Sequence, residues 1–371
     1  MKIANLAKPK GQGVDFVELF FDLVFVFSVT KVVENLHHDV SWSGIGHAVL
    51  VFWLIWWAWT QFTWSLNASN TEHPFIRIAV LLSTGIAFFM ATGVTTAFSA
   101  GALNFAIPYV LVKMIGNIIL YFVAIEIPTF KKRLRHWVSF SMGGLTAVLL
   151  GAILGGSYQL WFWGLAILLD VYTANTTGGG KYEFDFRHAH FAERHGLFVI
   201  IALGELLILT GSAFAGLAWT GELVLVVTLS VLLTISLWWL YFGRAKEEME
   251  NALVNAKDDQ LSNIAVETYS LLHFLILTGL VALAASLEIA ISHPAQPLHI
   301  NQTLLLVAGF ILFIAGIAAA IWRANQTVMR TRLLITTAAS LAMLAARNAQ
   351  VEVLLGIAIL AVLAIGVLEE D

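Results

Sequence analysis

The chain alternates between long apolar stretches and short polar connections, and this pattern decides the class of fold. A helix that crosses the hydrocarbon core of a bilayer needs about 20 consecutive, mostly apolar residues, and the sequence contains about a dozen such stretches. The pattern predicts an all-α protein, a polytopic transmembrane bundle of about 12 helices. The predicted spans cover residues 14–33, 44–66, 74–97, 103–125, 137–154, 157–174, 190–213, 221–242, 264–290, 303–322, 332–346 and 349–368.

The distribution of Lys and Arg between these spans predicts the orientation of the chain, because basic residues near span ends stay on the cytoplasmic side. With the N-terminus inside, the external connections at 98–102, 214–220 and 291–302 hold no Lys or Arg. Both termini are therefore predicted to be cytoplasmic. The basic residues on the cytoplasmic side are then Lys2, Lys8, Lys10, Arg77, Lys131, Lys132, Arg133, Arg135, Lys181, Arg187, Arg244, Lys246, Lys257, Arg323, Arg330 and Arg332.

The composition supports a membrane protein and excludes several other classes. Of the 371 residues, 59% are hydrophobic and only 12% are charged, whereas a soluble domain carries about 25% charged residues. A net charge of −4 gives no indication of nucleic-acid binding. Because the chain has no Cys, disulfides, thiolate metal sites and thiol nucleophiles are excluded.

Two halves of six helices each, 1–187 and 188–371, share short motifs in the same order. The pair Trp56-Trp57 in the second span matches Trp238-Trp239 in the eighth. Six helices is an even number, so both halves start on the same side, and we predict two parallel six-helix repeats as in many transporters. The alternative is a bundle without symmetry. The polar segment 244–263 is predicted to be an amphipathic cytoplasmic helix in the second half.

The first span carries an acidic stripe. Asp15, Glu18 and Asp22 are spaced i, i+3 and i+7, which places them within about 60° of each other on a helix. An ionisable side chain in the bilayer interior costs a few kcal/mol on insertion scales and is by default a functional candidate. These acids are therefore predicted to face the bundle interior, a wet cavity or a cationic partner. The structural alternative is an ion pair with Arg194 or Lys113.

The seventh span is the second candidate region. His190, Glu193, Arg194 and Glu205 share one helical face, and His195 lies to its side. Acids and bases that face one cavity can exchange protons or bind a cation, but buried ion pairs also occur as static structural elements. We predict an ion- or proton-binding site made by Glu18, Asp22, Glu193, Arg194 and Glu205. A supporting polar network is predicted to include Asp15, Lys113, Asp170, His195 and His273.

The histidines at the start of the seventh span suggest an alternative chemistry. His188, His190 and Glu193 could hold a divalent metal ion with carboxylate help. Their spacing is not the H-E-x-x-H pattern that places two ligands on one helical face. The main prediction is therefore that the protein has no metal site, no cofactor and no catalytic residues.

Two segments resemble the signature helices of the bacterial low temperature requirement protein A family. They run from Val14 to Val26 (V-D-F-V-E-L-F-F-D-L-V-F-V) and from His190 to Glu205 (H-F-A-E-R-H-G-L-F-V-I-I-A-L-G-E). The resemblance covers essentially the whole chain and implies a multi-pass protein of the bacterial plasma (inner) membrane. A fainter similarity links Phe20 to Phe25 with the F-S-D-x-V-F stretch of the endolysosomal potassium/proton channel family, with Phe21 in place of the Ser.

Three functions are compatible with these patterns. The leading hypothesis is a membrane transport protein that moves a cation or small solute, coupled to protons, through a polar site between the two repeats. The second is a membrane-embedded enzyme acting on lipid, with His188, His190, Glu193 and His195 as its metal or acid–base site. The third is a sensor or scaffold whose charges are purely structural. The expected partners are membrane lipid and protons or a small cation or solute, without nucleic acid, and a homo-oligomer is left open.

Overall fold

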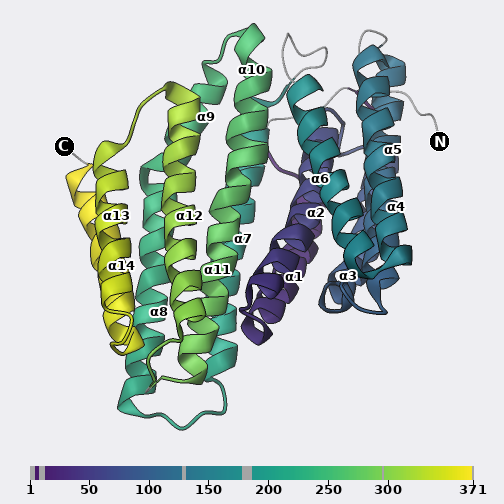
Figure 1. Cartoon of the computed structure of the whole chain (residues 1–371). Coiled ribbons are helices and arrows are strands. Elements are labelled where there is room, and N and C mark those ends of the chain that lie inside the picture. The colour runs from purple at the N-terminus through teal and green to yellow at the C-terminus, as the bar shows by residue number, and fades with distance from the viewer. Residues whose placement is uncertain (1–4, 8–12, 128–130, 178–185, 295, 370–371) are drawn as a thin grey trace. The chain divides into compact units, whose positions relative to one another are not determined.

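The computed structural model describes residues 5–7, 13–127, 131–177, 186–294 and 296–369, and within these ranges the chain is helical without any strand. Figure 1 shows the helices in chain order. Within the described ranges, three short segments differ from α-helix: the 3₁₀ turn η1 (Val94–Thr96) and the π-helical segments η3 (Tyr241–Ala245) and η4 (Ala265–Leu272). The α-helices are α1 (Phe16–His38), α2 (Trp42–Asn67), α3 (Pro74–Gly93), α4 (Ala102–Glu126), α5 (Lys131–Leu154), α6 (Gly156–Thr177), α7 (His188–Phe214), α8 (Gly221–Leu240), α9 (Lys246–Val254), α10 (Asp258–Ile264), α11 (His273–Ser292), α12 (Ile300–Asn325), α13 (Arg330–Ala345) and α14 (Val351–Leu368).

Most of the predicted spans match a helix within a few residues, and the all-α class is confirmed. Within the described residues, nine helical stretches are long and apolar enough to cross a membrane. Helices α1, α6 and α13 are not among them. Helix α13 is too short, with 16 residues. Helix α1 carries too many charged residues, because Glu18, Asp22, Lys31 and Glu34 all lie within it. The predicted orientation of the chain stays a prediction, and its basic residues Lys2, Lys8, Lys10 and Lys181 lie outside the described residues.

The ninth predicted span, 264–290, lies within the helical stretch Gln260–Ser292, which is long and apolar enough to cross a membrane. Its first residues form the end of α10 and the π-helical segment η4, and the regular helix α11 begins only at His273. The predicted amphipathic helix at 244–263 is divided into η3, α9 and α10. Met249 and Leu253 on α9 are buried within the protein. Their apolar side therefore packs against protein, and no bilayer contact is needed to explain it.

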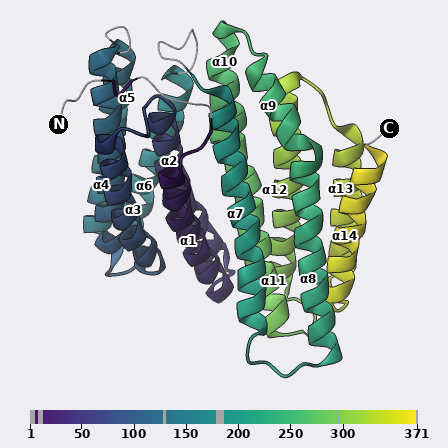
Figure 2. The ribbon, with the colours of Figure 1, turned by 180° about the vertical axis from the view of Figure 1, so that it is seen from behind.

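Two compact units divide the chain, and their boundaries differ from the predicted halves 1–187 and 188–371. The first unit comprises Met1–Val32, His47–Phe198 and Leu253–Val266. Within it α3 packs against α4, α4 against α5 and α5 against α6, as Figures 1 and 2 show. Helix α1 joins α2 through the rings of Phe21 and Phe62, whose centroids are 4.6 Å apart. The two six-helix repeats stay a prediction.

The second unit comprises Val33–Gly46, Val199–Ala252 and Glu267–Asp371. Its helices follow one another in the packing order α11, α12, α13, α14 and α8. Helices α11 and α12 touch through glycine: a Cβ atom on Gly279 would lie 2.5 Å from the Phe313 nitrogen and 2.8 Å from the Gly309 oxygen. This backbone-to-backbone approach is the small-residue packing typical of membrane helices.

A buried histidine, His273 at the start of α11, links the two π-helical segments η3 and η4. The Tyr241 hydroxyl lies 2.8 Å from Nε2 of His273, and Nδ1 of His273 lies 2.8 Å from the Thr268 carbonyl oxygen. A carbonyl oxygen only accepts, so Nδ1 carries the proton and Tyr241 donates to Nε2. The His273 ring therefore connects η3 to the backbone of η4. Its predicted place in the supporting network around the acidic stripe stays a prediction.

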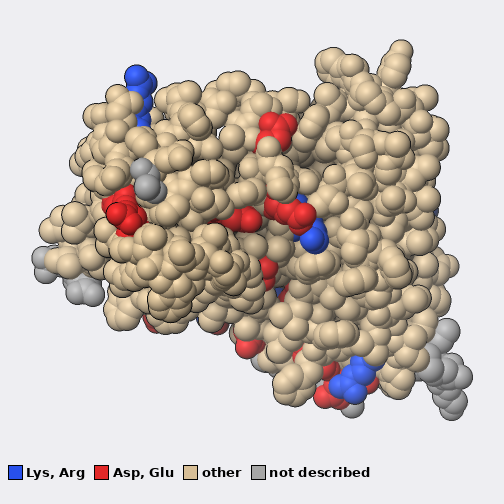
Figure 3. Space-filling view, turned by 90° about the horizontal axis from the view of Figure 1, so that it is seen from below, with Lys and Arg blue, Asp and Glu red and all other residues tan. Residues whose placement is uncertain are grey.

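The outer surface carries many large apolar side chains, as expected where helices face lipid. Ile153, Leu168 and Leu360 are each more than half exposed. Figure 3 looks from below at the ends of the helices, where a few acidic and basic side chains lie among residues that are neither. Trp161 lies near the start of α6 and Trp219 just before α8, and both are largely exposed. Tryptophans near span ends are typical of the membrane–water interface.

Candidate functional site

Two buried acids of α1 form the centre of the site. Glu18 and Asp22 are one helical turn apart, and neither side chain is accessible to solvent. The Glu18 carboxylate accepts a hydrogen bond from the backbone N–H of Asp15 at 3.0 Å, at the N-terminal end of α1. Such a bond satisfies one of the free N–H groups at a helix start. The remaining charge of both acids has to be compensated by neighbouring helices.

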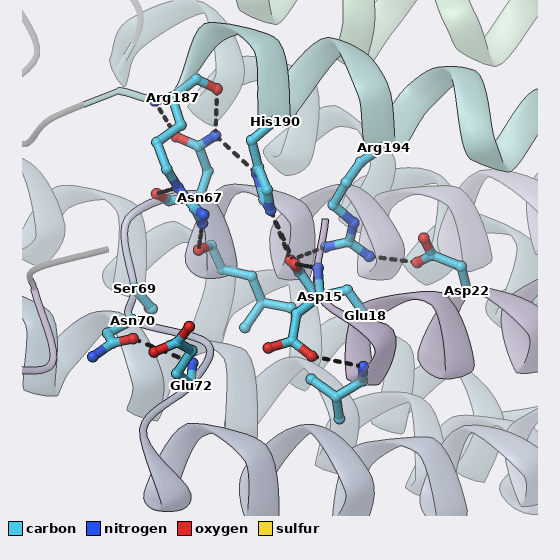
Figure 4. A network of polar contacts seen from close by, with 12 residues as sticks. Asp15, Glu18, Asp22, Asn67, Ser69, Asn70, Glu72, Arg187, His190 and Arg194 are labelled. Atoms are coloured by element: carbon cyan, nitrogen blue, oxygen red, sulfur yellow. Dashed lines mark hydrogen bonds and ion pairs between the residues drawn. The ribbon is translucent and has the colours of Figure 1, made fainter. Parts of the chain in front are cut away.

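Arg194 of α7 lies between the two acids. Its Nη1 is 3.4 Å from Glu18 Oε1, and its Nη2 donates to Asp22 Oδ1. The indole Nε1 of Trp59, on α2, donates to the same Asp22 oxygen at 2.7 Å. The Arg194 guanidinium also lies over the Trp59 ring, 5.4 Å from its centroid, in a cation–π contact. Three helices therefore hold one guanidinium between two carboxylates, as Figure 4 shows for α1 and α7.

His190 lies one turn before Arg194 on α7 and contacts the same acid. Its Nε2 is 3.1 Å and 3.0 Å from the two oxygens of Glu18. On its other side, Nδ1 is 3.3 Å from the Nδ2 atom of Asn67, the last residue of α2. Both side chains are fully buried. The imidazole thus connects a carboxylate to an amide (Figure 4).

The orientation of the Asn67 amide determines where His190 carries its proton. Asn67 Nδ2 donates to the backbone oxygen of Arg187 at 2.9 Å, and the Arg187 N–H donates to Asn67 Oδ1 at 3.2 Å. With the Asn67 amide nitrogen and oxygen exchanged, the NH₂ group would face the Arg187 N–H and the amide oxygen would face the Arg187 carbonyl oxygen, so neither hydrogen bond could form. Asn67 must therefore present an N–H to Nδ1 of His190, which has to accept. His190 is then neutral, with its proton on Nε2 facing Glu18.

With His190 neutral, the negative charges at the site outnumber the positive charges. Two carboxylates face one guanidinium and one neutral imidazole. Glu18 has contacts at both oxygens, whereas Asp22 Oδ2 and Arg194 Nε are buried without a hydrogen-bond partner in the described part of the protein. An unpaired buried carboxylate oxygen is costly. Asp22 Oδ2 is therefore the atom at which one more positive charge is best accommodated.

We expect Asn67→Asp to change the protonation of His190. A carboxylate at this position can only accept, so it would favour a proton on Nδ1 and a doubly protonated, cationic ring. The measurement is the ¹⁵N spectrum of histidine-labelled protein, with His190→Gln to assign the signal. The wild type should show a neutral ring protonated at Nε2, and Asn67→Asp a ring protonated at both nitrogens. A wild-type ring protonated at Nδ1 would contradict the assignment.

Of the other predicted residues, Asp15 contacts the site through its backbone N–H, which donates to Glu18. Asp15 pairs with Arg77 at 3.1 Å. Glu193 is half-buried beside Arg194 on α7, and Glu205 lies eleven residues after Arg194, in the second unit. The predicted roles of Glu193 and Glu205 in proton binding stay predictions. His195 faces the Trp59 ring at 5.0 Å, and its Nδ1 lies 2.8 Å from the Phe191 oxygen.

Lys113 and Asp170 form a second buried ion pair in the first unit. Lys113 Nζ on α4 is 3.1 Å from Asp170 Oδ1 on α6. Gln61 of α2 donates to the Lys113 carbonyl oxygen at 3.1 Å and to Asn117 Oδ1 at 2.8 Å. Here one cation meets one carboxylate, in contrast to the two carboxylates that share Arg194.

Asn67, Trp59 and Arg187 were not predicted to belong to the site. Trp59 and Asn67 are uncharged, so an inventory of intramembrane charges does not find them. Arg187 was counted only as a cytoplasmic basic residue, but it is 2% exposed and its guanidinium donates to the Leu66 and Asn67 carbonyl oxygens. The sequence signal for these residues is that polar side chains become frequent towards the end of α2, at Thr60, Gln61, Thr63, Ser65 and Asn67.

The histidines do not assemble into a metal site in the described residues, where no group of three or more His, Asp or Glu could hold a metal ion. His190 points to Glu18, whereas His195 lies among aromatic rings and His188 lies against Phe186. The alternative of a metal held by His188, His190 and Glu193 therefore has no support from this arrangement.

Comparisons with known proteins agree with the resemblance of the two signature helices. The model of a family described as "Bacterial low temperature requirement A protein (LtrA)" matches residues 13–368. The uncharacterized protein RA0937 of Rhizobium meliloti (strain 1021) is 29% identical to this chain over 315 residues, which is 81% of the chain and 75% of the relative. No solved structure matches the chain.

Proposed function

The chain belongs to the bacterial low temperature requirement A family, and from this premise we propose that it is a transport protein that moves a cation or small solute together with protons. The observation that carries the proposal is the buried oxygen Asp22 Oδ2, which has no partner in the described residues while two acids share Arg194. Ionisable groups this deep in a membrane protein commonly belong to proton or ion pathways.

Protonation of Asp22 would change the contacts of Arg194. A proton from water forms a new O–H bond at Oδ2, and the site gains one positive charge. The ionic attraction between Arg194 and Asp22 is then lost, and Glu18 becomes the only carboxylate that holds the guanidinium. Release of the proton restores the shared position. Two arrangements of one arginine, distinguished by one proton, are the kind of bistable element that coupled transport requires.

A structural role for the same charges is the second candidate, and one observation favours it. Glu18, Asp22 and Arg194 are all fully buried, and buried charges held by good partners can serve only to fix helix packing. The two candidates differ in whether Asp22 changes its protonation while the protein works. A purely structural site predicts that the Asp22→Asn variant alters stability and leaves transport unaffected.

We expect proteoliposomes of the wild type to show proton flux driven by a sodium or potassium gradient, measured with an entrapped pH-sensitive dye. Asp22→Asn should reduce this flux to the level of empty vesicles, because the amide cannot take up and release the proton. Glu222→Gln is the matched control, since this acid is exposed in the first turn of α8 and should keep wild-type flux.

A loss of flux in Asp22→Asn has to be distinguished from a failure of this variant to fold. Thermal unfolding of each purified variant shows whether Asp22→Asn is folded at the temperature of the flux measurement. Wild-type flux in a folded Asp22→Asn variant would leave the structural role as the better account. Absence of flux in the wild type under proton, sodium and potassium gradients would contradict ion-coupled transport.

A further inference from the structure

A cavity of about 260 Å³ lies where α4 ends and α5 begins, away from the buried acids of α1. Both helices belong to the first unit and lie side by side (Figures 1 and 2). The lining combines two kinds of residue: apolar or aromatic side chains on both helices, and two bases on α5. The lining residues are Tyr121, Ala124, Ile125, Lys131, Leu134 and Arg135.

The two bases are placed to act together. Lys131 and Arg135 are four residues apart on α5, so they lie on the same helical face, and both are exposed. Among the described residues, no carboxylate forms an ion pair with either of them. As far as the described part of the chain is concerned, both charges are therefore open to an anion at the cavity.

The cavity lies next to the ends of two candidate membrane spans. The candidate span of α4 ends at Glu126 and that of α5 covers Leu134–Leu154, so Lys131, the first residue of α5, lies just outside these candidate spans. Tyr121 and Ile125, one turn apart on α4, are 58% and 49% exposed. They extend the cavity wall along the apolar part of the helix. The occupant must therefore be anionic at one end and apolar at the other.

We propose that this cavity binds an anionic phospholipid. The phosphate lies between the Lys131 ammonium and the Arg135 guanidinium. A guanidinium suits phosphate because two of its N–H groups can bind two phosphate oxygens at once. An acyl chain follows Tyr121 and Ile125 along α4. A free phosphate ion would leave this apolar wall unused, so the apolar half of the site selects a lipid. The inference does not depend on the proposed transport function.

The test compares lipid binding by native mass spectrometry of the purified full-length protein. Phosphatidylglycerol should bind in preference to phosphatidylcholine, and inorganic phosphate at equal concentration should not displace it. The double variant Lys131→Gln/Arg135→Gln should lose about thirtyfold of this preference, from about 1 kcal/mol for each basic residue near the membrane surface. The control Lys257→Gln/Arg330→Gln removes two exposed bases that do not line the cavity and should keep the preference.

A second measurement keeps all charges intact and does not depend on how the double variant folds. A photo-crosslinking amino acid at position 125 should attach to phosphatidylglycerol, and excess phosphatidylcholine should not compete. Equal binding of the two lipids to the wild type would overturn the proposal. Retention of the preference in Lys131→Gln/Arg135→Gln, or displacement of the lipid by inorganic phosphate alone, would overturn it as well.

Discussion

Arg194→Ala is expected to destabilise the protein by about 3–5 kcal/mol, the range found when one partner of a buried ion pair is removed. The variant leaves Glu18 and Asp22 one turn apart, both fully buried and without their shared cation. The repulsion between them and the loss of charge-assisted hydrogen bonds act in the same direction. Thermal unfolding in detergent measures the effect as a lowered midpoint.

Neutralising the two acids should reverse most of this loss. The triple variant Arg194→Ala/Glu18→Gln/Asp22→Asn carries no charge at the site and is expected to be more stable than Arg194→Ala alone, because no uncompensated carboxylate remains. Arg330→Ala, at an exposed position at the start of α13, is the matched control and should unfold as the wild type does. An Arg194→Ala variant as stable as the wild type would show that Arg194 does not hold these acids.

Gly279→Ala is expected to destabilise the second unit by about 1–3 kcal/mol, the cost of inserting a methyl group into a closely packed interface. The added Cβ would lie 2.5 Å from the Phe313 nitrogen, which belongs to the backbone of α12 and cannot rotate away. Helices α11 and α12 would have to separate. The measurement is again the midpoint of thermal unfolding in detergent.

Gly356→Ala provides the comparison for this substitution. Gly356 lies within α14, and a Cβ placed there would meet no atom within 4 Å. Because alanine is the better helix former by about 1 kcal/mol, this variant should be as stable as the wild type or slightly more stable. If Gly279→Ala behaved like Gly356→Ala, the close approach of α11 and α12 would be refuted.

The helices could be predicted from the sequence because apolar length alone sets most of their bounds. The span predicted at 190–213 is α7 (His188–Phe214), and that at 44–66 is α2 (Trp42–Asn67). The π-helical segment η4 could not be predicted, since a π-helical turn adds one residue without changing the apolar character of the stretch. The contacts that divide the chain into two units are likewise not encoded in the length of any one span.

Part of the candidate site could also be predicted. Charged side chains are costly to place in a membrane, and for this reason Glu18, Asp22 and Arg194 could be singled out from the sequence. The structure brings these three together. The same costs do not apply to Trp59 and Asn67, which are neutral and matter only because α2 packs beside α1 and α7. His190 was placed on the correct face of α7, but its proton position depends on Asn67, which requires the three-dimensional structure.

Proton uptake by Asp22, at the site that it shares with Glu18 and Arg194, is what the proposed transport function requires. Infrared difference spectroscopy of the purified protein over a pH series measures this directly, through the C=O stretch of a protonated carboxylic acid. If Asp22 takes up a proton, a band grows as the pH falls, and this band is absent in Asp22→Asn but present in Glu222→Gln. A spectrum in which Asp22→Asn and the wild type show the same carboxylic acid bands at every pH would contradict this uptake.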